Sequence, residues 1–174
     1  TLLDGVSFTL DAGEKVAICE QMADPSTVRG IVPREVVRVV SSGLCLDPES
    51  LDARKDNYVA AVEQGADGYG IAAYELTTGT LVLMRAESSA RVLAELVRLE
   101  PRELLGRSAV LASMPELSAA LPRTFARKDV VRSPSSLELL RASLAERWSS
   151  LGDGSLHEAA LDVLAYAQSS QPAA

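Results

Sequence analysis

The sequence YVAAVEQGADGYGIAAYELTTGTLVLMR, residues 58–85, contains three short apolar runs divided by turn-forming residues. The runs at residues 58–64, 69–76 and 81–85 combine β-branched, aromatic and aliphatic side chains in lengths that suit strands. GADG and TTGT between the runs supply the small and polar residues of tight turns. The stretch therefore predicts an antiparallel meander of three strands.

A helix is predicted directly after the meander. Ser88 or Ser89 can cap its start, and Pro101 stops it. Its apolar residues recur at helical spacing and predict one buried face: Val92, Leu93, Leu96 and Val97.

Strands and helices alternate in the rest of the chain. We expect a fourth strand at residues 109–112, parallel to a sheet neighbour, a short helix at residues 115–121 and an edge strand at residues 124–131. Two capping boxes, each a serine with a glutamate three residues later, predict the starts of two closing helices: Ser135 with Glu138, and Ser155 with Glu158. This order gives an α/β fold, with a mixed sheet flanked by helices.

The residues before the meander predict a smaller unit. Residues 15–19 and 36–40 are apolar runs that favour two strands, and Asp24-Pro25 opens a helical turn between them that ends at Gly30. Residues 41–56 lack periodicity and contain glycine, proline and several acids. They predict a linker that contains a domain boundary.

Composition narrows the function classes. The 174 residues carry a formal net charge of -7 and a sequence pI near 4.8, which argues against a free-standing nucleic-acid binder. Cys19 and Cys45 have only His157 as another soft ligand, so the sequence suggests neither a zinc site nor a disulfide framework. It has no apolar run of membrane-spanning length and no signal peptide, and predicts a cytoplasmic protein.

Two enzyme classes are alternatives. Residues 2–18 resemble the strand pair before the phosphate loop of ABC-type ATPases, but residues 19–26 read CEQMADPS and contain no glycine to cradle a phosphate. A meander followed by βα units also begins ribonuclease-H-like nucleases, which hold two metal ions with sheet carboxylates. Residues 59–62 are apolar here, and Glu63 and Glu75 have no third acid on an obvious element. Neither enzyme is favoured.

Two basic series stand out in an acidic chain. Arg29, Arg34 and Arg38 accompany the second strand, and Arg123, Arg127, Lys128 and Arg132 surround the predicted edge strand. Solvated surface charge is the simplest interpretation. The functional alternatives are contact with a phosphate backbone for the first series and protein docking for the second.

GEKVAICEQMADPSTVRGIVPREVVRVVSSG, residues 13–43, resembles the end of the mismatch-reading domain of the MutS family of bacterial mismatch-repair proteins. It reproduces most of the family pattern G-x-x-V-A-I-C-E-Q, then D-P, then a basic residue before glycine, then R-x-V-V-R. RKDNYVAAVEQ, YGIAAYELTTG and LEPRELL resemble the opening of the family's connector domain, and AALDVLAYAQ resembles its closing helix. Residues 1–10 do not match, and SSGL replaces the usual T-P-G-T.

The resemblance implies a domain organisation. It places the C-terminal remnant of a partial α/β mismatch-recognition domain at residues 1–45, with residues 1–10 atypical, and a linker at residues 46–56. Residues 57–171 would then form a ribonuclease-H-like connector domain without catalytic acids.

The resemblance also implies a function. The chain would be a non-catalytic fragment that couples mismatched-DNA binding to the ATPase and to MutL, with no cofactor of its own and with ATP and magnesium bound by the full-length parent. Its partners would be mismatched double-stranded DNA through the full-length protein, MutL, the rest of MutS and its dimer partner, and no membrane. Gln21 and Arg38 would contact the DNA backbone, and we assign partner docking to Arg123, Arg127 and Lys128.

Overall fold

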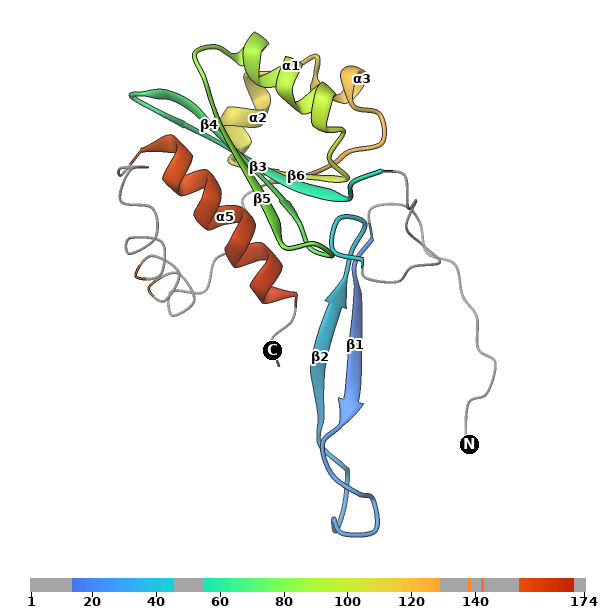
Figure 1. Cartoon of the computed structure of the whole chain (residues 1–174). Helices are drawn as coiled ribbons and strands as arrows, with labels where there is room; N and C mark the ends of the chain where they lie inside the picture. Colours follow the sequence, from blue (N-terminus) through green and yellow to red (C-terminus); the bar gives the residue numbers. More distant parts are fainter. Residues whose placement is uncertain (1–13, 46–54, 129–137, 139–141, 143–153, 171–174) are drawn as a thin grey trace.

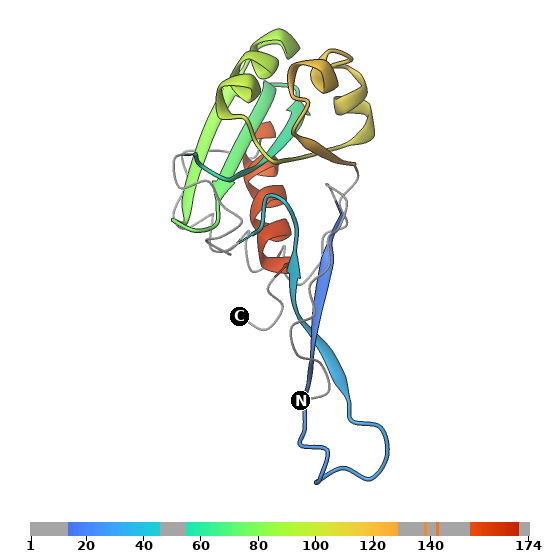
Figure 2. The same ribbon diagram turned by 90° about the vertical axis from the view of Figure 1, so that its right-hand side faces the viewer.

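A two-stranded hairpin projects from a five-stranded sheet that carries helices on both faces (Figure 1). The computed structural model describes residues 14–45, 55–128, 138, 142 and 154–170. The view turned by 90° separates the layers and shows the hairpin extending away from the sheet (Figure 2). The chain is therefore a mixed α/β protein.

The predicted meander is confirmed and forms three neighbouring strands of the sheet. β3 (Tyr58–Gly65), β4 (Gly68–Glu75) and β5 (Thr80–Ala86) pair antiparallel. β6 (Glu103–Gly106) and β7 (Phe125–Lys128) run parallel to β3, which gives the order β5-β4-β3-β6-β7. β7 is an edge of the sheet in the part of the chain that the structure describes, as the sequence predicts.

The predicted fourth strand at residues 109–112 is wrong. Those residues belong to helix α2 (Ser108–Ala112), and the strand parallel to β3 is β6, a few residues earlier. Leu104 and Leu105 are buried in different cores on opposite faces of the sheet, as consecutive residues of a central strand must be. Val110 and Leu111 instead pack into a single core, which suits a helical turn.

Two apolar cores fix the layers. On one face, α1 (Ser89–Leu99), α2 and α3 (Leu117–Ala120) cover a core that contains Leu96, Leu104 and Leu111. On the other face, α5 (Ser155–Ser169) covers a second core. Strand β3 supplies both cores, because Val59 and Ala61 face α5 while Ala60 and Val62 face α1.

Helix α1 begins and ends as predicted but turns one apolar residue outward. Ser88 caps it by accepting the Arg91 N–H at 3.3 Å, and the helix closes at Glu100, whose φ of 45° is left-handed. The predicted buried face includes Val97, but this side chain is 44% exposed. Leu99 takes the buried position instead.

Helix α5 begins without the predicted capping box. Its N-cap is Gly154, which has no side chain, and Ser155 is buried. Asp67, in the turn between β3 and β4, accepts the Ser155 N–H at 3.3 Å and caps the helix from a distant part of the sequence. A Cβ on Gly70 would lie 2.3 Å from the backbone of Ser155 and Leu156, so β4 and α5 approach closely. Of the other predicted box, Ser135 lies outside the described residues.

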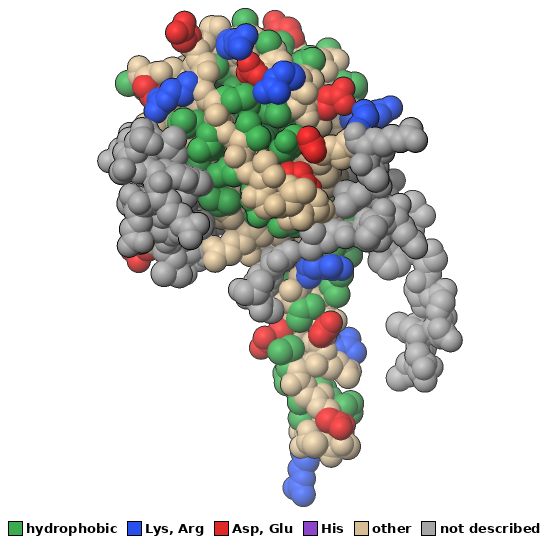
Figure 3. Space-filling view, viewed as in Figure 1, with side chains coloured by type: hydrophobic (Ala, Val, Ile, Leu, Met, Phe, Trp, Pro, Cys, Tyr) green, Lys and Arg blue, Asp and Glu red, His purple; other side chains and the backbone are tan. Residues whose placement is uncertain are grey.

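The hairpin confirms the two N-terminal strands. β1 (Val16–Gln21) and β2 (Arg34–Val40) pair antiparallel, with an irregularity between Ile18 and Cys19. Asp24 accepts the Ser26 N–H at 2.8 Å in a turn that does not extend into a helix. Charged and apolar side chains alternate over the surface of the hairpin (Figure 3). None of the helices in the described part of the chain has the length and apolarity to cross a membrane.

Candidate functional site

A buried carboxylate ties the hairpin to the sheet. Glu103, the first residue of β6, is 0% exposed. Its Oε1 accepts the Ser42 hydroxyl at 3.0 Å and the Gly43 N–H at 3.1 Å, and its Oε2 accepts the Tyr166 hydroxyl at 2.5 Å. One side chain therefore joins the segment after β2, the sheet and helix α5.

Gly43 packs against the sheet so closely that no side chain fits. A Cβ at this position would lie 2.5 Å from Cγ2 of Val59. The Asn57 side-chain amide donates to the Gly43 carbonyl at 3.4 Å. Glycine at this position allows the backbone to reach the Glu103 carboxylate.

The end of α5 contacts the base of the hairpin directly. The Val39 N–H of β2 donates to the Ser170 carbonyl at 2.7 Å. The Lys15 ammonium lies 4.4 Å from the ring centroid of Tyr166, within cation–π range. We call this whole set of contacts the joint: Lys15, Val39, Ser42, Gly43, Asn57, Glu103, Tyr166 and Ser170.

Glu103 also corrects the sequence analysis, because it is a third acid in the sheet that the sequence pattern missed. The sequence analysis finds no matching third acid for Glu63 and Glu75, and Glu103 lies on a strand, β6, that it does not predict. Register places Glu103 beside Val59, at the opposite end of β3 from Glu63. Glu63 pairs with Arg107 at 3.3 Å, and Glu75 accepts bonds from Thr77 and Thr78.

These carboxylates do not fit a two-metal nuclease centre. Within the described ranges, no group of three or more His, Cys, Asp or Glu side chains is placed to hold a metal ion. Burial acts to raise the pKa of Glu75, but the hydrogen bonds from Thr77 and Thr78 outweigh it and lower the pKa. Each of the three acids holds neighbouring polar groups of the fold.

The structure places the two predicted DNA contacts apart on the hairpin. Gln21 pairs in register with Arg34, whereas Arg38 pairs with Ile18, nearer the base. Both side chains are exposed. Their contact with DNA stays a prediction.

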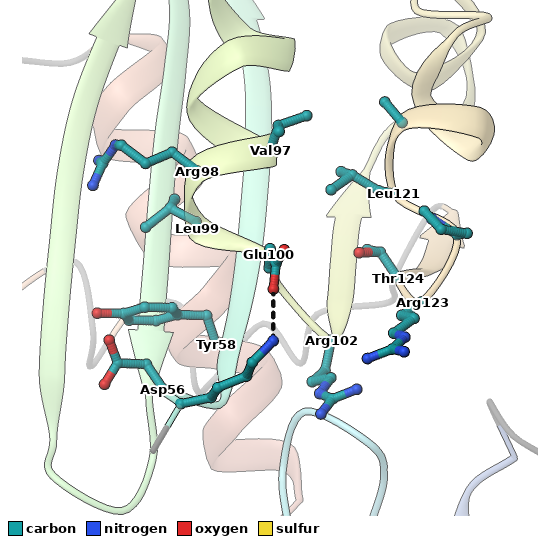
Figure 4. A pocket seen from close by; sticks show the side chains of 13 residues that line it. Asp56, Tyr58, Val97, Arg98, Leu99, Glu100, Arg102, Leu121, Arg123 and Thr124 are labelled. Carbon is teal, nitrogen blue, oxygen red and sulfur yellow. Dashed lines mark hydrogen bonds and ion pairs between the residues drawn. The ribbon is translucent and has the colours of Figure 1, made fainter. Parts of the chain in front are cut away.

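The predicted docking residues lie along one segment at the sheet edge. Arg123 is exposed and precedes β7, and Arg127 and Lys128 belong to β7. Arg123 lines a cavity of about 440 Å³ between α1, β6 and the segment after α3 (Figure 4). Of the three docking residues, the structure describes the side-chain surroundings of Arg123 alone.

Two family patterns match the chain. MutS domain II matches residues 57–171, and MutS domain I matches residues 6–49. The DNA mismatch repair protein MutS of Sorangium cellulosum is 45% identical over 125 residues, which are 66% of this chain and 13% of that protein. The MutS protein of Syntrophobacter fumaroxidans is 44% identical over 102 residues, which are 58% of this chain and 12% of that protein.

The chain thus spans about an eighth of the length of these relatives. A solved structure of a simian T-cell lymphotropic virus intasome with PP2A regulatory subunit B56 gamma aligns with a TM-score of 0.34 and 10% identity. The alignment covers 65% of this chain and 49% of that one. A likeness at this level carries no argument about function.

Proposed function

Since this chain belongs to the MutS family of DNA mismatch repair proteins, we propose that it is a non-catalytic segment that couples mismatched-DNA binding to the ATPase and to MutL. The two matched domains meet at the joint, where a single carboxylate bonds both sides. This contact is the observation that carries the proposal, because a mechanical link needs a defined attachment on both sides.

We assign residues 57–171 to a ribonuclease-H-like connector. Support comes from the strand order β5-β4-β3-β6-β7, in which a meander is followed by two strands parallel to β3 and each reached through helical segments. A sheet covered on both faces transmits displacement as a body, because packed interiors have low compressibility. The hairpin and α5 would then move together.

The test measures coupling directly. In an intact MutS protein that contains this segment, the affinity for mismatched DNA is measured with and without ATP, and the ratio gives the coupling factor. We expect Glu103→Ala to reduce that ratio several-fold, because it removes the acceptor for Ser42, Gly43 and Tyr166.

Glu63→Gln is the matched control. Glu63 is also a buried sheet carboxylate, but it lies at the other end of β3 and pairs with Arg107. It should lower stability and leave the coupling ratio unchanged. Equal effects of the two variants on the ratio would reduce the joint to a stabilising contact and remove the proposal's main support.

We propose no chemistry for the chain itself. A nuclease would need carboxylates that converge on metal ions, whereas Glu63, Glu75 and Glu103 are each engaged with different polar partners. ATP and magnesium would be bound elsewhere in the cytoplasmic parent protein. Magnesium-dependent cleavage of oligonucleotides or ATP turnover by the purified chain would overturn this assignment.

Docking to MutL is assigned to the segment that contains Arg123, Arg127 and Lys128. Support comes from the cationic sequence along the sheet edge of an acidic chain. Charge reversal of Arg127 and Lys128 in the full-length protein should weaken MutL recruitment in a pull-down and leave mismatch binding intact. Unchanged recruitment would remove the assignment.

Contact with the DNA backbone is assigned to Gln21 and Arg38, acting in the full-length protein and alongside its dimer partner. Exposure of both side chains supports the proposal. Arg38 lies nearer the base of the hairpin than Gln21, so the two side chains would meet different phosphates.

A further inference from the structure

The cavity of about 440 Å³ beside β6 is lined by cationic side chains at one end and by apolar side chains along its walls (Figure 4). Its volume lies in the range of sites that hold small ligands or a few side chains. Arg102 and Arg123 lie at one end, and Val97 and Leu121 line the walls between α1 and the segment after α3.

Arg102 and Arg123 are two of the four cationic side chains in the lining of the cavity. Lys55, also in the lining, pairs with Glu100 at 3.2 Å, and Arg98 pairs with Glu95 at 2.9 Å and points away from the other two. Arg102 and Arg123 form no ion pair with a carboxylate in the described part of the chain. In a chain of net charge -7, two such guanidinium groups at one cavity produce a local positive field.

The backbone around both arginines is held in place. The Arg102 N–H donates to the Tyr58 carbonyl at 2.8 Å, and the Thr124 hydroxyl donates to the Pro101 carbonyl at 2.5 Å. These bonds fix the two segments that carry the guanidinium groups. A ligand would therefore meet a backbone that is already held in place, which reduces the entropy lost on binding.

The apolar wall points to the kind of ligand. Val97 is 44% exposed, and Leu121, which is buried in the core, lines the same cavity. Exposed apolar surface beside clustered charge is typical of protein recognition sites. DNA would bring phosphates and no aliphatic side chain to pack against Val97.

We propose that this cavity binds an acidic peptide segment of a partner protein. Carboxylates of the peptide would pair with Arg102 and Arg123, and one of its apolar side chains would pack against the exposed Val97. Arginine suits this role because its guanidinium binds carboxylates through two parallel hydrogen bonds. The inference stands whether or not the partner is MutL.

Fluorescence anisotropy tests the proposal with the full 174-residue chain. The probe is a labelled hexapeptide of alternating glutamate and leucine. We expect saturable binding that weakens with salt, and a loss of roughly tenfold or more in affinity in the Arg102→Gln, Arg123→Gln double variant, because charge-assisted hydrogen bonds are removed. Val97→Ser should weaken binding severalfold through the loss of apolar contact.

Arg91→Gln is the control, since Arg91 is an exposed cation of α1 that does not line the cavity. It should change the affinity less than twofold. A probe with serine in place of leucine should bind more weakly, and a probe with lysine in place of glutamate should not bind. The proposal fails if the double variant binds the acidic probe normally, if no binding occurs, or if a DNA duplex displaces the probe through these arginines.

Discussion

The hairpin and the central strand of the sheet have similar β-forming sequences but opposite environments. Val59, Ala60, Ala61 and Val62 of β3 are 0% exposed, because helices cover both faces of the sheet. No residue of β1 or β2 is fully buried, and Val36 is 42% exposed. An isolated two-stranded hairpin is only marginally stable in water. The comparison teaches that the sheet is ordered by its cores, while the hairpin depends on the joint at its base.

The largest effect is expected when an apolar side chain is shortened to alanine in the sheet and, for comparison, in the hairpin. Leu104→Ala should lower the free energy of unfolding by about 3 kcal/mol, because it leaves a cavity beneath α1 in a fully buried core. Val36→Ala should cost about 0.5 kcal/mol or less, since its side chain is already partly in water. Urea denaturation of the two variants measures both values. Equal losses in the free energy of unfolding would show that Val36 packs into a core, contrary to this comparison.

A smaller loss of stability is expected from a substitution in the joint. Gly43→Ala should cost about 1–3 kcal/mol, because the added methyl group overlaps Cγ2 of Val59 and pushes the backbone from Glu103. The measurement is hydrogen exchange, in which the Val39 amide should lose protection while β3 amides keep theirs.

Gly79→Ala is the control for that experiment. Gly79 has a φ of 69° in the turn between β4 and β5, with no atom near an added Cβ. Its replacement strains the backbone but should leave the Val39 amide protected. If Gly43→Ala also leaves Val39 protected, the hairpin does not depend on the joint.

The elements that sequence predicted well are those whose signal is local. The meander followed from apolar runs of strand length and from two turn sequences. Ser88 was one of two candidate caps, because a serine hydroxyl can bond within its own helix. The edge strand β7 also followed from a local run.

The features that sequence missed depend on partners far along the chain. Strand β6 begins with a charged residue, and the hydrogen bonds from Tyr166, Ser42 and Gly43 help to make its burial acceptable. Asp67 replaced the predicted cap at Ser155 across 88 positions. No local pattern reports such pairings. The structure places Gln21, Arg38 and Arg123 on exposed surfaces, while the sequence did not predict the joint.

The smallest expected effect concerns pH and compares one carboxylate from each region. The backbone N–H of Ser26 lowers the pKa of Asp24 at the hairpin tip, and the backbone N–H of Ser155 lowers the pKa of Asp67 beside α5. A pKa lowered by folding adds stability above the unfolded value of about 3.9, and this stability is lost as pH falls through the folded pKa.

The hydrogen bonds that lower the two pKa values join residues at very different separations in the sequence, and this difference sets the expected outcome. Asp24 bonds Ser26 two residues away, so the unfolded chain can retain part of that turn and its shift. Asp67 bonds Ser155 across 88 positions, and unfolding must break that contact. The stability of Asp67→Asn should therefore fall less steeply than that of the unsubstituted chain as pH is lowered from about 5 to about 3. The stability of Asp24→Asn should fall as steeply as that of the unsubstituted chain. Thermal unfolding across this range measures the slopes, and matching slopes for both variants would mean that the hairpin tip is coupled to global unfolding as strongly as the sheet.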